Sequence, residues 1–404
     1  MTGSSFYSVE KIADGRSGGT TQAETRVYNE RLIVSLIRRH GQLSKADLTR
    51  LTGLAAQTIT TIVNRAADGE LLRRLEPLRG RLGQPSVPYA LNPGAAYSFG
   101  LKIDHRNADV ALVDFVGEVI GFERIVFEYP MPSEVMAFAK AAIARMCRKH
   151  KTAKDRIAGL GIASPFHQWN WSEEFGAPSG PLSAWKQIDI RAELDQVFDW
   201  PVYLFNDAMV SAGAELLFGT GIGRMDFLYA YIGHFIGGGL VLDHHLFPGR
   251  NRLAGALGKV PVPAPGQPDR PVPLLRVASL YSLAARLGGA EAARIWASPE
   301  DWGSLGGGLV AWIDEVSDGL AYATRSAVAV LDVDNLVIDG AMPAGVRKEI
   351  AKATRRKLAH SVVDHPEPFS VLEGRFGHLA PVIGGASIPL LVKYSNDKES
   401  LFKE

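Results

Sequence analysis

The sequence has few of the features that would place the protein in a membrane or around a metal ion. Its 404 residues include a single cysteine, Cys147, which excludes an intrachain disulfide and a cysteine-rich zinc site. No run approaches 18 apolar residues, and the N-terminus lacks the basic and apolar layout of a signal peptide. We therefore expect a cytoplasmic protein without membrane contact.

The chain also has almost no net charge, at +1, but this charge is unevenly distributed. Eleven basic and five acidic residues lie between Arg26 and Asn92, so this segment carries +6 and the remainder −5. A basic segment on a mildly acidic body indicates a polyanionic partner, although a solvated basic face would give the same count. The length and a hydrophobic content of 46% predict two or three domains with sizeable cores.

The basic segment has the pattern of three helices followed by two strands. Apolar spacing and a good N-cap at Ser44 predict helices over residues 25–40, 45–51 and 55–68. One strand is expected to begin at residues 71–72 and a second to span residues 87–91, on either side of a flexible basic loop. This order predicts a winged helix-turn-helix over residues 25–92, after a flexible arm of residues 1–24, with a domain boundary at Asn92-Pro93-Gly94.

The third of these helices carries the residues expected to read DNA. In a helix-turn-helix, the second helix of the pair enters the major groove, where amide side chains pair with adenine and arginines bind phosphate. The residues predicted to contact double-stranded operator DNA are Lys45, Gln57, Thr58, Thr60, Thr61, Asn64 and Arg65, with Arg79 and Arg81 in a narrow minor groove. A protein-binding module of three helices is the alternative.

Beyond residue 93 the pattern changes to alternating strands and helices. Three consecutive strands, a helix and a buried strand are predicted over residues 98–103, 108–114, 119–127, 133–149 and 157–163. A helix over residues 188–198, a strand over 202–205 and a helix over 208–218 follow, and residues 335–339 form a last strand. Between them, Gly237, Gly238 and Gly239 are expected to form a turn joining two strands, whose backbone N–H groups approach an anion.

Several of these segments resemble the ROK family of repressors, open reading frames and sugar kinases, over roughly residues 93–395. They are the Gly-rich hairpin, AGALGK at residues 254–259, Asn206-Asp207-Ala208, and RGRLGQPSVPYALNP, which resembles the wing and linker of family repressors. The resemblance implies an α/β actin-like, ribonuclease H-like fold of two lobes over residues 93–404. One lobe would hold residues 93–207 and the C-terminal helix, and the other residues 208–385.

The resemblance also implies that the groups of a kinase have been replaced. Asp207 matches the family's catalytic base and is retained, whereas Asp104, in the first phosphate loop, is followed by no glycine. Phe235 stands where the second phosphate loop has glycine, and Asp339 replaces one glycine of a pair in the adenosine region. These differences predict a vestigial base, vestigial phosphate loops at Asp104 and at Gly237 to Gly239, and no ATP as cofactor.

On the sugar side of the same resemblance, the acidic groups are replaced by neutral or basic ones. Ala256 and Lys259 stand where the family has Glu and His, and a further family Glu falls near Arg276. The pocket is therefore expected to be basic and to bind a sugar or sugar acid. The predicted ligand-binding residues are Asn206, Asp207, Lys259 and Trp185, the last of which is also compatible with a core position.

We thus expect a transcriptional regulator, a repressor, whose degenerate kinase body is catalytically inactive. A homo-oligomer, dimer or tetramer, is the expected assembly, and the family's cysteine-rich zinc segment is missing, so no zinc is expected. Two alternatives remain: an active ATP-dependent sugar kinase with a DNA-binding head, and a ligand-free DNA-binding scaffold. The pair His244-His245 is interpreted as a turn, and Glu215 as part of a solvated helical face.

Overall fold

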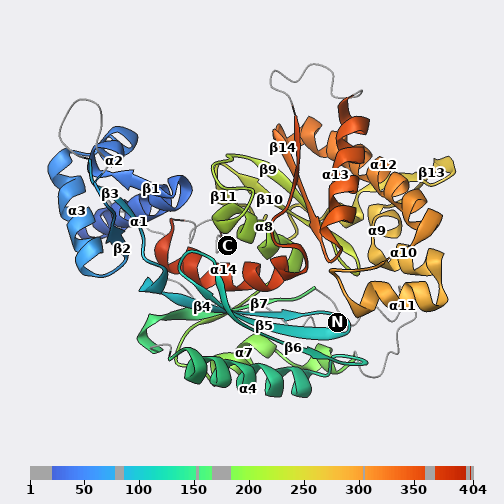
Figure 1. Cartoon of the computed structure of the whole chain (residues 1–404), viewed down its shortest axis with the longest axis horizontal. Coiled ribbons are helices and arrows are strands. Elements are labelled where there is room, and N and C mark those ends of the chain that lie inside the picture. Colours follow the sequence, from blue (N-terminus) through green and yellow to red (C-terminus); the bar gives the residue numbers. More distant parts are fainter. Residues whose placement is uncertain are drawn as a thin grey trace, which may run out of the picture.

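Two five-stranded sheets of the same design form the body of the molecule (Figure 1). The computed structural model describes residues 21–77, 86–151, 154–165, 183–303, 305–359, 369–396 and 401. The first sheet has the order β6-β5-β4-β7-β8. Its strands are β4 (Tyr97–Ile103), β5 (Asn107–Asp114), β6 (Val119–Val126), β7 (Ile157–Ala163) and β8 (Val202–Phe205).

The second sheet repeats this topology in the order β11-β10-β9-β14-β15. Its strands are β9 (Phe227–Ile232), β10 (Ile236–Leu242), β11 (His245–Leu246), β14 (Asn335–Gly340) and β15 (Ser370–Glu373). In each sheet three antiparallel strands are followed by two parallel ones. The repetition confirms the predicted two-lobed α/β body.

Two central helices, α8 (Asp207–Phe218) and α14 (Ala380–Tyr394), lie between the sheets. Helix α14 covers the first sheet at a distance that leaves no room for side chains at two strand positions. A Cβ atom on Gly100 of β4 would lie 1.9 Å from the carbonyl oxygen of Val382, and one on Gly161 of β7 would lie 1.9 Å from that of Gly385. Glycine is therefore required on both strands for the helix to dock.

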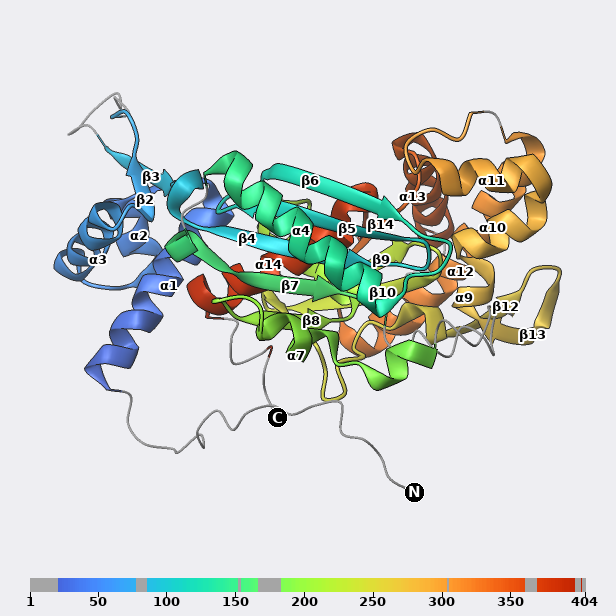
Figure 2. The same cartoon turned by 90° about the horizontal axis from the view of Figure 1, so that it is seen from below.

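The other helices of the body lie outside the two sheets (Figures 1 and 2). Below the first sheet lie α4 (Pro132–His150) and α7 (Ile190–Asp195). The second sheet is flanked by a helical region made of α9 (Leu274–Val277), α10 (Leu280–Leu287), α11 (Gly289–Ala297), α12 (Gly306–Leu331) and α13 (Ala344–Ala359). Strands β12 (Pro261–Ala264) and β13 (Gln267–Pro273) form a separate hairpin. No helix in the described part of the chain is long and apolar enough to cross a membrane.

The N-terminal unit contains the three predicted helices and one strand more than predicted. Its elements are α1 (Gln22–His40), β1 (Gln42–Ser44), α2 (Lys45–Thr52), α3 (Ala56–Asp68), β2 (Leu72–Arg74) and β3 (Pro88–Leu91). Capping boxes at Thr21 and Ser44 start α1 and α2, and Gly53, with φ 69°, ends α2 in the left-handed conformation. The unpredicted strand β1 pairs with β3, so the sheet has three strands.

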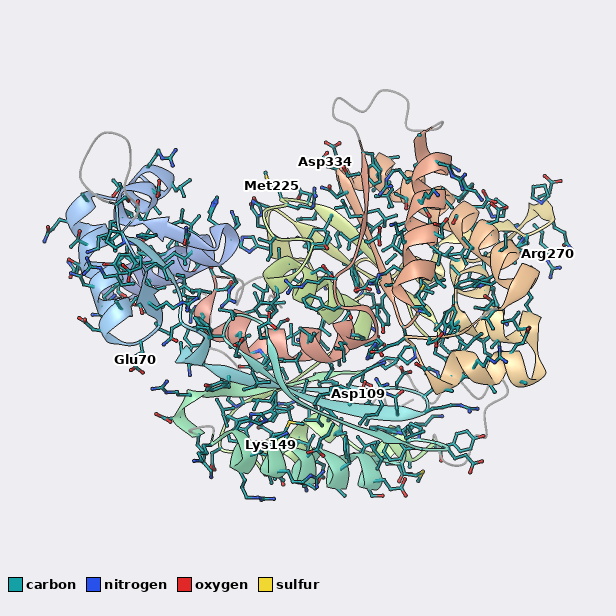
Figure 3. The ribbon with its side chains drawn as sticks, viewed as in Figure 1. Glu70, Asp109, Lys149, Met225, Arg270 and Asp334 are labelled. Atoms are coloured by element: carbon teal, nitrogen blue, oxygen red, sulfur yellow. The ribbon has the colours of Figure 1, made fainter. Side chains whose placement is uncertain are left out.

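The N-terminal unit packs directly on the body through a shared hydrophobic core. Ile33 and Ile37 of α1 belong to the same buried cluster as Phe115 of the first lobe. Polar contacts reinforce this junction: the Arg38 guanidinium donates to the Phe115 carbonyl oxygen (2.7 Å), and Arg156 pairs with Glu70 (2.6 Å). Glu70 lies at the end of the unit that faces the first sheet (Figure 3). The unit is thus held to the body at more than one point.

One prediction about the Gly-rich segment is wrong. The turn between β9 and β10 is formed by residues 233–235, and Gly237 to Gly239 lie inside β10, paired with β9. A Cβ atom at Gly237 would lie 2.6 Å from Cβ of Ala208, and one at Gly239 would lie 2.7 Å from Cβ of Ala212. These two glycines allow β10 to pack closely against α8.

Candidate functional site

A pocket of about 270 Å³ opens between the two lobes. The first lobe contributes Asp104 and His105 from the loop after β4, and Asn206 and Asp207 line it at the start of α8. The second lobe contributes the β9–β10 turn, part of β10 and the segment before β12, namely residues 231, 233–238, 252–254, 256 and 258–259. The two loops expected to hold phosphate and the segment expected to hold sugar therefore meet in one place.

The N-terminus of α8 places two polar side chains in this pocket. The Asn206 side chain caps the helix by accepting from the Met209 backbone N–H (3.1 Å), and Asp207 accepts from the N–H of Ala208 (2.9 Å). Burial, together with the nearby charge of Asp104, raises the pKa of Asp207 to about 6. A carboxyl group with this pKa is able both to accept a proton and to hydrogen-bond a hydroxyl near neutral pH.

The carboxylate of Asp104 contacts neighbouring side chains of the first lobe. Its carboxylate pairs with Lys102 (2.8 Å) and lies 3.1 Å from Nδ1 of His105. Burial favours the neutral acid, but the charge of Lys102 and the hydrogen bond from His105 outweigh it and hold the pKa of Asp104 well below its usual range. Asp104 is therefore an anion whose charge is already balanced inside the lobe.

A cluster of aromatic rings lies where the two loops meet. The imidazole of His105 stacks on that of His234, with ring centroids 4.0 Å apart and planes 9° from parallel. His234 also stacks on Trp296 of α11, with ring centroids 4.8 Å apart. Phe235 meets His105 edge-on at 5.1 Å and lies at a tilt of 49° to Tyr281 of α10, at 5.9 Å. We call these five residues the ring cluster; it joins the first lobe to the second. Sequence analysis singled out only Phe235 among them.

The ring cluster is uncharged at its centre. Burial, with a further contribution from His105, lowers the pKa of His234 to about 3. Burial also lowers the pKa of His105, despite the opposing hydrogen bond with Asp104. Neutral imidazoles stack as aromatic rings, so the cluster places uncharged ring surface rather than a cationic phosphate-binding group between the two loops.

The predicted ligand-binding residues are only partly brought together. Asn206, Asp207 and Lys259 all line the pocket, whereas Trp185 lies in the hydrophobic core of the first lobe, 6% exposed. The Trp185 indole N–H donates to the Pro130 carbonyl oxygen (2.7 Å), so its single donor is already used. Trp185 is therefore a core residue, contrary to its assignment as a ligand contact.

The charge of the pocket also differs from the prediction of a basic site. Arg252 was not predicted, yet it lines the pocket beside Lys259, with its guanidinium 5.3 Å from the ring centroid of Phe205. Two acidic residues, Asp104 and Asp207, also line the pocket. Arg276, which was expected near the sugar, is exposed and does not belong to the lining. The lining of the pocket thus carries both positive and negative charges.

Asp339 does not face a nucleotide but lies inside the second lobe. It is fully buried, its Oδ1 accepts from the backbone N–H of Gly377 (3.0 Å), and Arg347 lies 3.2 Å away. Glu215 of α8 is also fully buried, hydrogen-bonds the Asp339 carboxyl, and accepts from the backbone N–H of Arg375 (2.6 Å). The interpretation of Glu215 as solvated is therefore wrong.

These two buried carboxyl groups form a pair that holds a proton. Burial, and then the charge of Glu215, raises the pKa of Asp339 to about 8, although Arg347 opposes the shift. Burial likewise raises the pKa of Glu215. Because two carboxylates in contact cannot both be ionised without a large penalty, the pair keeps a shared proton at neutral pH.

Most of the predicted DNA-contacting residues of α3 share one exposed face. Gln57, Thr58, Thr61 and Asn64 are exposed and Thr60 is half-buried, while Ile59, Ile62 and Val63 are buried against the rest of the unit. The N-cap residue, Ala55, makes no side-chain hydrogen bond, and the first turn of α3 has no acidic residue. The helix therefore presents backbone N–H groups and its positive dipole end to solvent, which suits an anion.

Other predicted contacts have partners within the protein. The Lys45 ammonium donates to the Asn64 side-chain oxygen (2.8 Å), so these two residues lie together. Arg65 turns back to α1, where it pairs with Glu30 at 2.7 Å, which the sequence prediction missed. Arg79 and Arg81 lie outside the described residues.

No metal site is evident within the described ranges of the chain, where three or more His, Cys, Asp or Glu side chains do not converge. The interpretation of His244-His245 as a turn holds for His244, whereas His245 is the first residue of β11. Asp243 and His244 have φ of 51° and 62° and connect β10 to β11, and Nδ1 of His244 lies 2.9 Å from the Arg224 carbonyl oxygen. The predicted absence of zinc and ATP stays a prediction.

The duplicated sheets and the two helices between them give the body an actin-like fold of the sugar-kinase type. The sequence agrees: residues 99–271 match the model of the ROK family. A solved structure of a ROK family transcriptional regulator, a homologue of the Escherichia coli Mlc protein, superposes with a TM-score of 0.64 at 19% identity, covering 93% of this chain and 98% of that one. The ROK hexokinase of Thermus thermophilus gives 0.51 at 20% identity, covering 72% and 97%.

Similar sequences include named repressors. The Xylose repressor of Bacillus spizizenii is 24% identical over 60% of this chain and 62% of its own length. The DNA-binding transcriptional repressor Mlc of Escherichia coli is 24% identical over 58% of this chain and 57% of its own length. The matches thus span about three fifths of these two repressors.

Proposed function

We propose that the protein is a transcriptional regulator, most simply a repressor, that binds operator DNA through a winged helix-turn-helix formed by α1 to β3. The observation that carries this proposal is the exposed face of α3, where Gln57, Thr58, Thr61 and Asn64 follow an uncapped helix start. Amide side chains on such a face can read adenine, and the free N–H groups can bind phosphate. The names of the similar repressors agree with this role.

Phosphate anchoring in this proposal comes from the strand that borders α3. Arg73 and Arg74 of β2 are both exposed, whereas Arg65 is held by Glu30. Lys45 would have to exchange its bond with Asn64 for a phosphate as the complex forms. We therefore expect Asn64 and Gln57 to carry sequence preference and Arg73 to carry affinity.

We infer that the body does not transfer phosphate from ATP. A kinase needs a phosphate cradle of backbone N–H groups near its catalytic base. Here the two loops that would form it are joined through His105 and His234. The same loops offer rings in place of glycine, which supports a body that binds a ligand without reacting with it.

A sugar or sugar acid is the ligand class that the lining of the interlobe pocket supports. Asn206 and Asp207 offer hydrogen bonds to hydroxyl groups, and Lys259 and Arg252 offer cations for a carboxylate. Ligand bound between the lobes would favour one degree of lobe closure. Through a homo-oligomer, dimer or tetramer, closure would alter the spacing of two DNA-binding units, and linkage requires DNA to alter ligand affinity by the same factor.

An active sugar kinase with a DNA-binding head is a second candidate, favoured by one observation. The pKa of Asp207, raised to about 6 by burial and by Asp104, suits a general base for a sugar hydroxyl. Incubation of the purified protein with ATP and a panel of hexoses and pentoses, followed by measurement of ADP, tests it. Sugar-dependent ADP release that Asp207→Asn abolishes would establish the kinase and overturn the inactive body.

DNA binding is tested by titrating the full-length protein into its own upstream DNA and into a scrambled duplex at several salt concentrations. We expect a preference of several kcal/mol for the upstream DNA, in the range of specific complexes. Gln57→Ala and Asn64→Ala should reduce this preference by about 1–3 kcal/mol each. Equal, purely salt-dependent binding to both duplexes would instead show a nonspecific basic module.

The phosphate contact has a matched control on the body. Arg73→Ala should weaken binding to both duplexes and lower the salt slope by about 1, whereas Arg356→Ala, which removes an exposed arginine from α13, should change neither. Equal effects of the two variants would mean that overall charge, rather than the N-terminal unit, binds DNA. A ligand-free scaffold would show DNA binding without a thermal shift in any sugar or sugar acid.

A further inference from the structure

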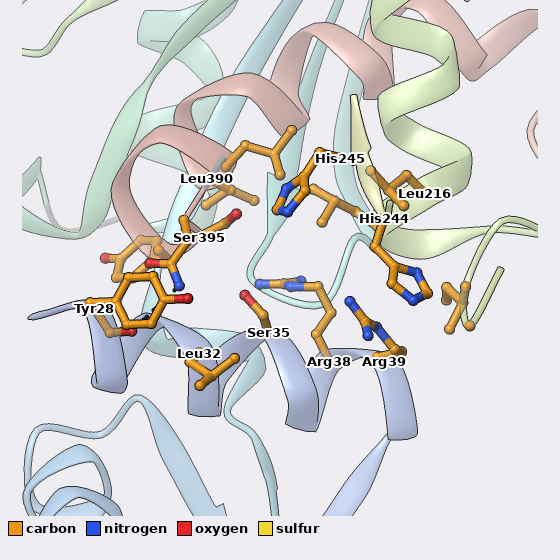
Figure 4. A pocket seen from close by; sticks show the side chains of 16 residues that line it. Tyr28, Leu32, Ser35, Arg38, Arg39, Leu216, His244, His245, Leu390 and Ser395 are labelled. Atoms are coloured by element: carbon orange, nitrogen blue, oxygen red, sulfur yellow. Dashed lines mark hydrogen bonds between the residues drawn. The ribbon is translucent and has the colours of Figure 1, made fainter. Parts of the chain in front are cut away.

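A second cavity, of about 320 Å³, lies at the junction of the N-terminal unit with the body (Figure 4). One wall is α1, which contributes Tyr28, Leu32, Ser35, Arg38 and Arg39. The opposite walls come from the end of α8 with the loop after it, the β10–β11 turn, and the end of α14 with residues 395–396. Its volume is in the range of small-molecule sites, and it is separate from the interlobe pocket.

The polar lining of this junction cavity is basic. Arg38 and Arg39 project from α1 towards His244 and His245 of the β10–β11 turn (Figure 4). None of the described residues that line the cavity is acidic. Burial lowers the pKa of Arg38 to about 10, although the charge of Asp114 opposes the shift, so Arg38 keeps its charge at neutral pH. Burial, and then the charge of Arg39, lowers the pKa of His244, so the arginines supply the positive charge.

Two arginines of α1 line the cavity. Arg38 is fixed: it donates to the Phe115 carbonyl oxygen, and its guanidinium lies 4.8 Å from the Phe115 ring centroid. Arg39 is half-buried on the same helix and also lines the cavity. A guanidinium held by packing is pre-organised, so an anion that reaches it need not order a flexible side chain.

The remaining lining is apolar and favours a ligand with a hydrocarbon part. Leucines and an isoleucine contribute from three elements and a loop, namely Leu32, Leu216, Leu217, Ile222, Leu390 and Leu391. Inorganic ions alone would leave this surface uncovered. We propose that the junction cavity binds a small amphipathic anion, a carboxylate or phosphate monoester with an aromatic or aliphatic body, and that its occupancy changes DNA affinity.

The effect on DNA follows from what the occupant would touch. It would contact α1, the first helix of the N-terminal unit, together with the end of α8 and the β10–β11 turn of the second lobe. A ligand that prefers one arrangement of these elements stabilises it and shifts any property that depends on it. This second step rests on the proposed DNA-binding function, whereas binding of the anion does not.

Calorimetric titration of the full-length protein tests the site directly. The probe is phenyl phosphate, with benzyl alcohol as its uncharged counterpart, at constant ionic strength. We expect one phenyl phosphate per chain and at least tenfold weaker binding of benzyl alcohol. Arg39→Gln should weaken the binding of phenyl phosphate at least tenfold, because it removes one cation and leaves the hydrogen bond from Arg38 to Phe115 in place.

Two further variants distinguish the site from general charge effects. Ser35→Phe fills the cavity without changing its charge, and it should also weaken the binding of phenyl phosphate at least tenfold. Arg26→Gln makes the same charge change on the exposed start of α1, outside the cavity, and should leave binding unchanged. The site would be overturned if phenyl phosphate did not bind, or if benzyl alcohol bound equally well. It would also be overturned if phenyl phosphate bound to both Arg39→Gln and Ser35→Phe as tightly as to the unmodified chain.

The coupling is measured by titrating upstream DNA with and without saturating phenyl phosphate. We expect at least a threefold change in DNA affinity for the unmodified chain and for Arg26→Gln, and none for Arg39→Gln. An unchanged DNA affinity despite calorimetric binding would overturn the coupling. If the protein binds no DNA at all, the proposed function fails, and calorimetry still decides whether the junction cavity binds the anion.

Discussion

Replacing Asp339 by asparagine is expected to make the stability of the protein less dependent on pH between about pH 6 and pH 8. The buried pair of Asp339 and Glu215 holds a proton because burial raises both pKa values, and the charge of Glu215 further raises that of Asp339, to about 8. Asparagine has nearly the same shape and can keep the acceptor oxygen used by the Gly377 N–H. It carries no titrating proton.

The sign follows from counting protons in the two states. Above about pH 4 an unfolded aspartate is ionised, whereas the folded pair stays protonated until the pH approaches 8. The folded protein then binds one proton more than the unfolded chain, so the free energy of unfolding falls as the pH rises. One proton gives a slope of at most about 1.4 kcal/mol per pH unit, and about 2 kcal/mol between pH 6 and pH 8.

The assay is urea unfolding at pH 6, 7 and 8, followed by circular dichroism for both proteins. The histidines of the ring cluster also titrate, but their contribution is the same in both proteins and cancels in the difference. Relative to the variant, the unmodified chain should lose about 2 kcal/mol between pH 6 and pH 8. Asp269→Asn, on the exposed hairpin strand β13, is the matched control.

A flat difference between the unmodified chain and Asp339→Asn across this range would refute the shared proton. It would mean that Arg347, 3.2 Å from Asp339, keeps both carboxyl groups ionised when the protein is folded. Equal pH profiles for Asp339→Asn and Asp269→Asn, both shifted from that of the unmodified chain, would refute the assignment to the buried pair. Either result would make Asp339 an ordinary ion-pair partner.

Three further substitutions test the packing that positions the two cavities. Gly161→Ala places a Cβ atom 1.9 Å from the Gly385 carbonyl oxygen, so we expect a loss of more than about 3 kcal/mol or insoluble protein; soluble protein with unchanged urea unfolding would contradict this. Trp185→Phe removes the hydrogen bond to Pro130 and should cost about 1–2 kcal/mol while leaving sugar-induced thermal shifts unchanged; loss of those shifts would restore it as a ligand contact. Arg38→Met should cost about 1–3 kcal/mol by leaving the buried Phe115 carbonyl unpaired, and an unchanged unfolding midpoint would show that solvent reaches this group.

Local patterns in the sequence were sufficient to predict most elements of the fold. The helices of the N-terminal unit and most strands of the two sheets follow from apolar periodicity and capping residues such as Ser44, but β11 was not predicted, and β15 follows the strand expected to be the last. The three-residue strand β1 was missed because so short a segment has no periodicity of its own. It becomes a strand only by pairing with β3, which is far along the chain.

The errors at the sites arise where a distant segment decides the environment. Gly237 and Gly239 suggest a turn locally, but they lie in β10 because α8 packs against them. Arg65 was assigned to DNA although Glu30, 35 residues away, binds it. Glu215 was expected to be solvated, but the backbone N–H of Arg375, 160 residues away, lets it be buried. No local pattern contains these partners.

Helix α8 connects the two cavities and gives them a physical means of communication. Its first residue, Asp207, lines the interlobe pocket, and Leu216 and Leu217 near its end line the junction cavity. A helix of 12 residues spans about 18 Å and moves as a rigid body over that length. Because the glycines of β10 bring α8 against the second sheet, closure of the lobes should carry both ends of the helix together. A ligand in either cavity would then bias the same movement, and by linkage each should alter the affinity of the other.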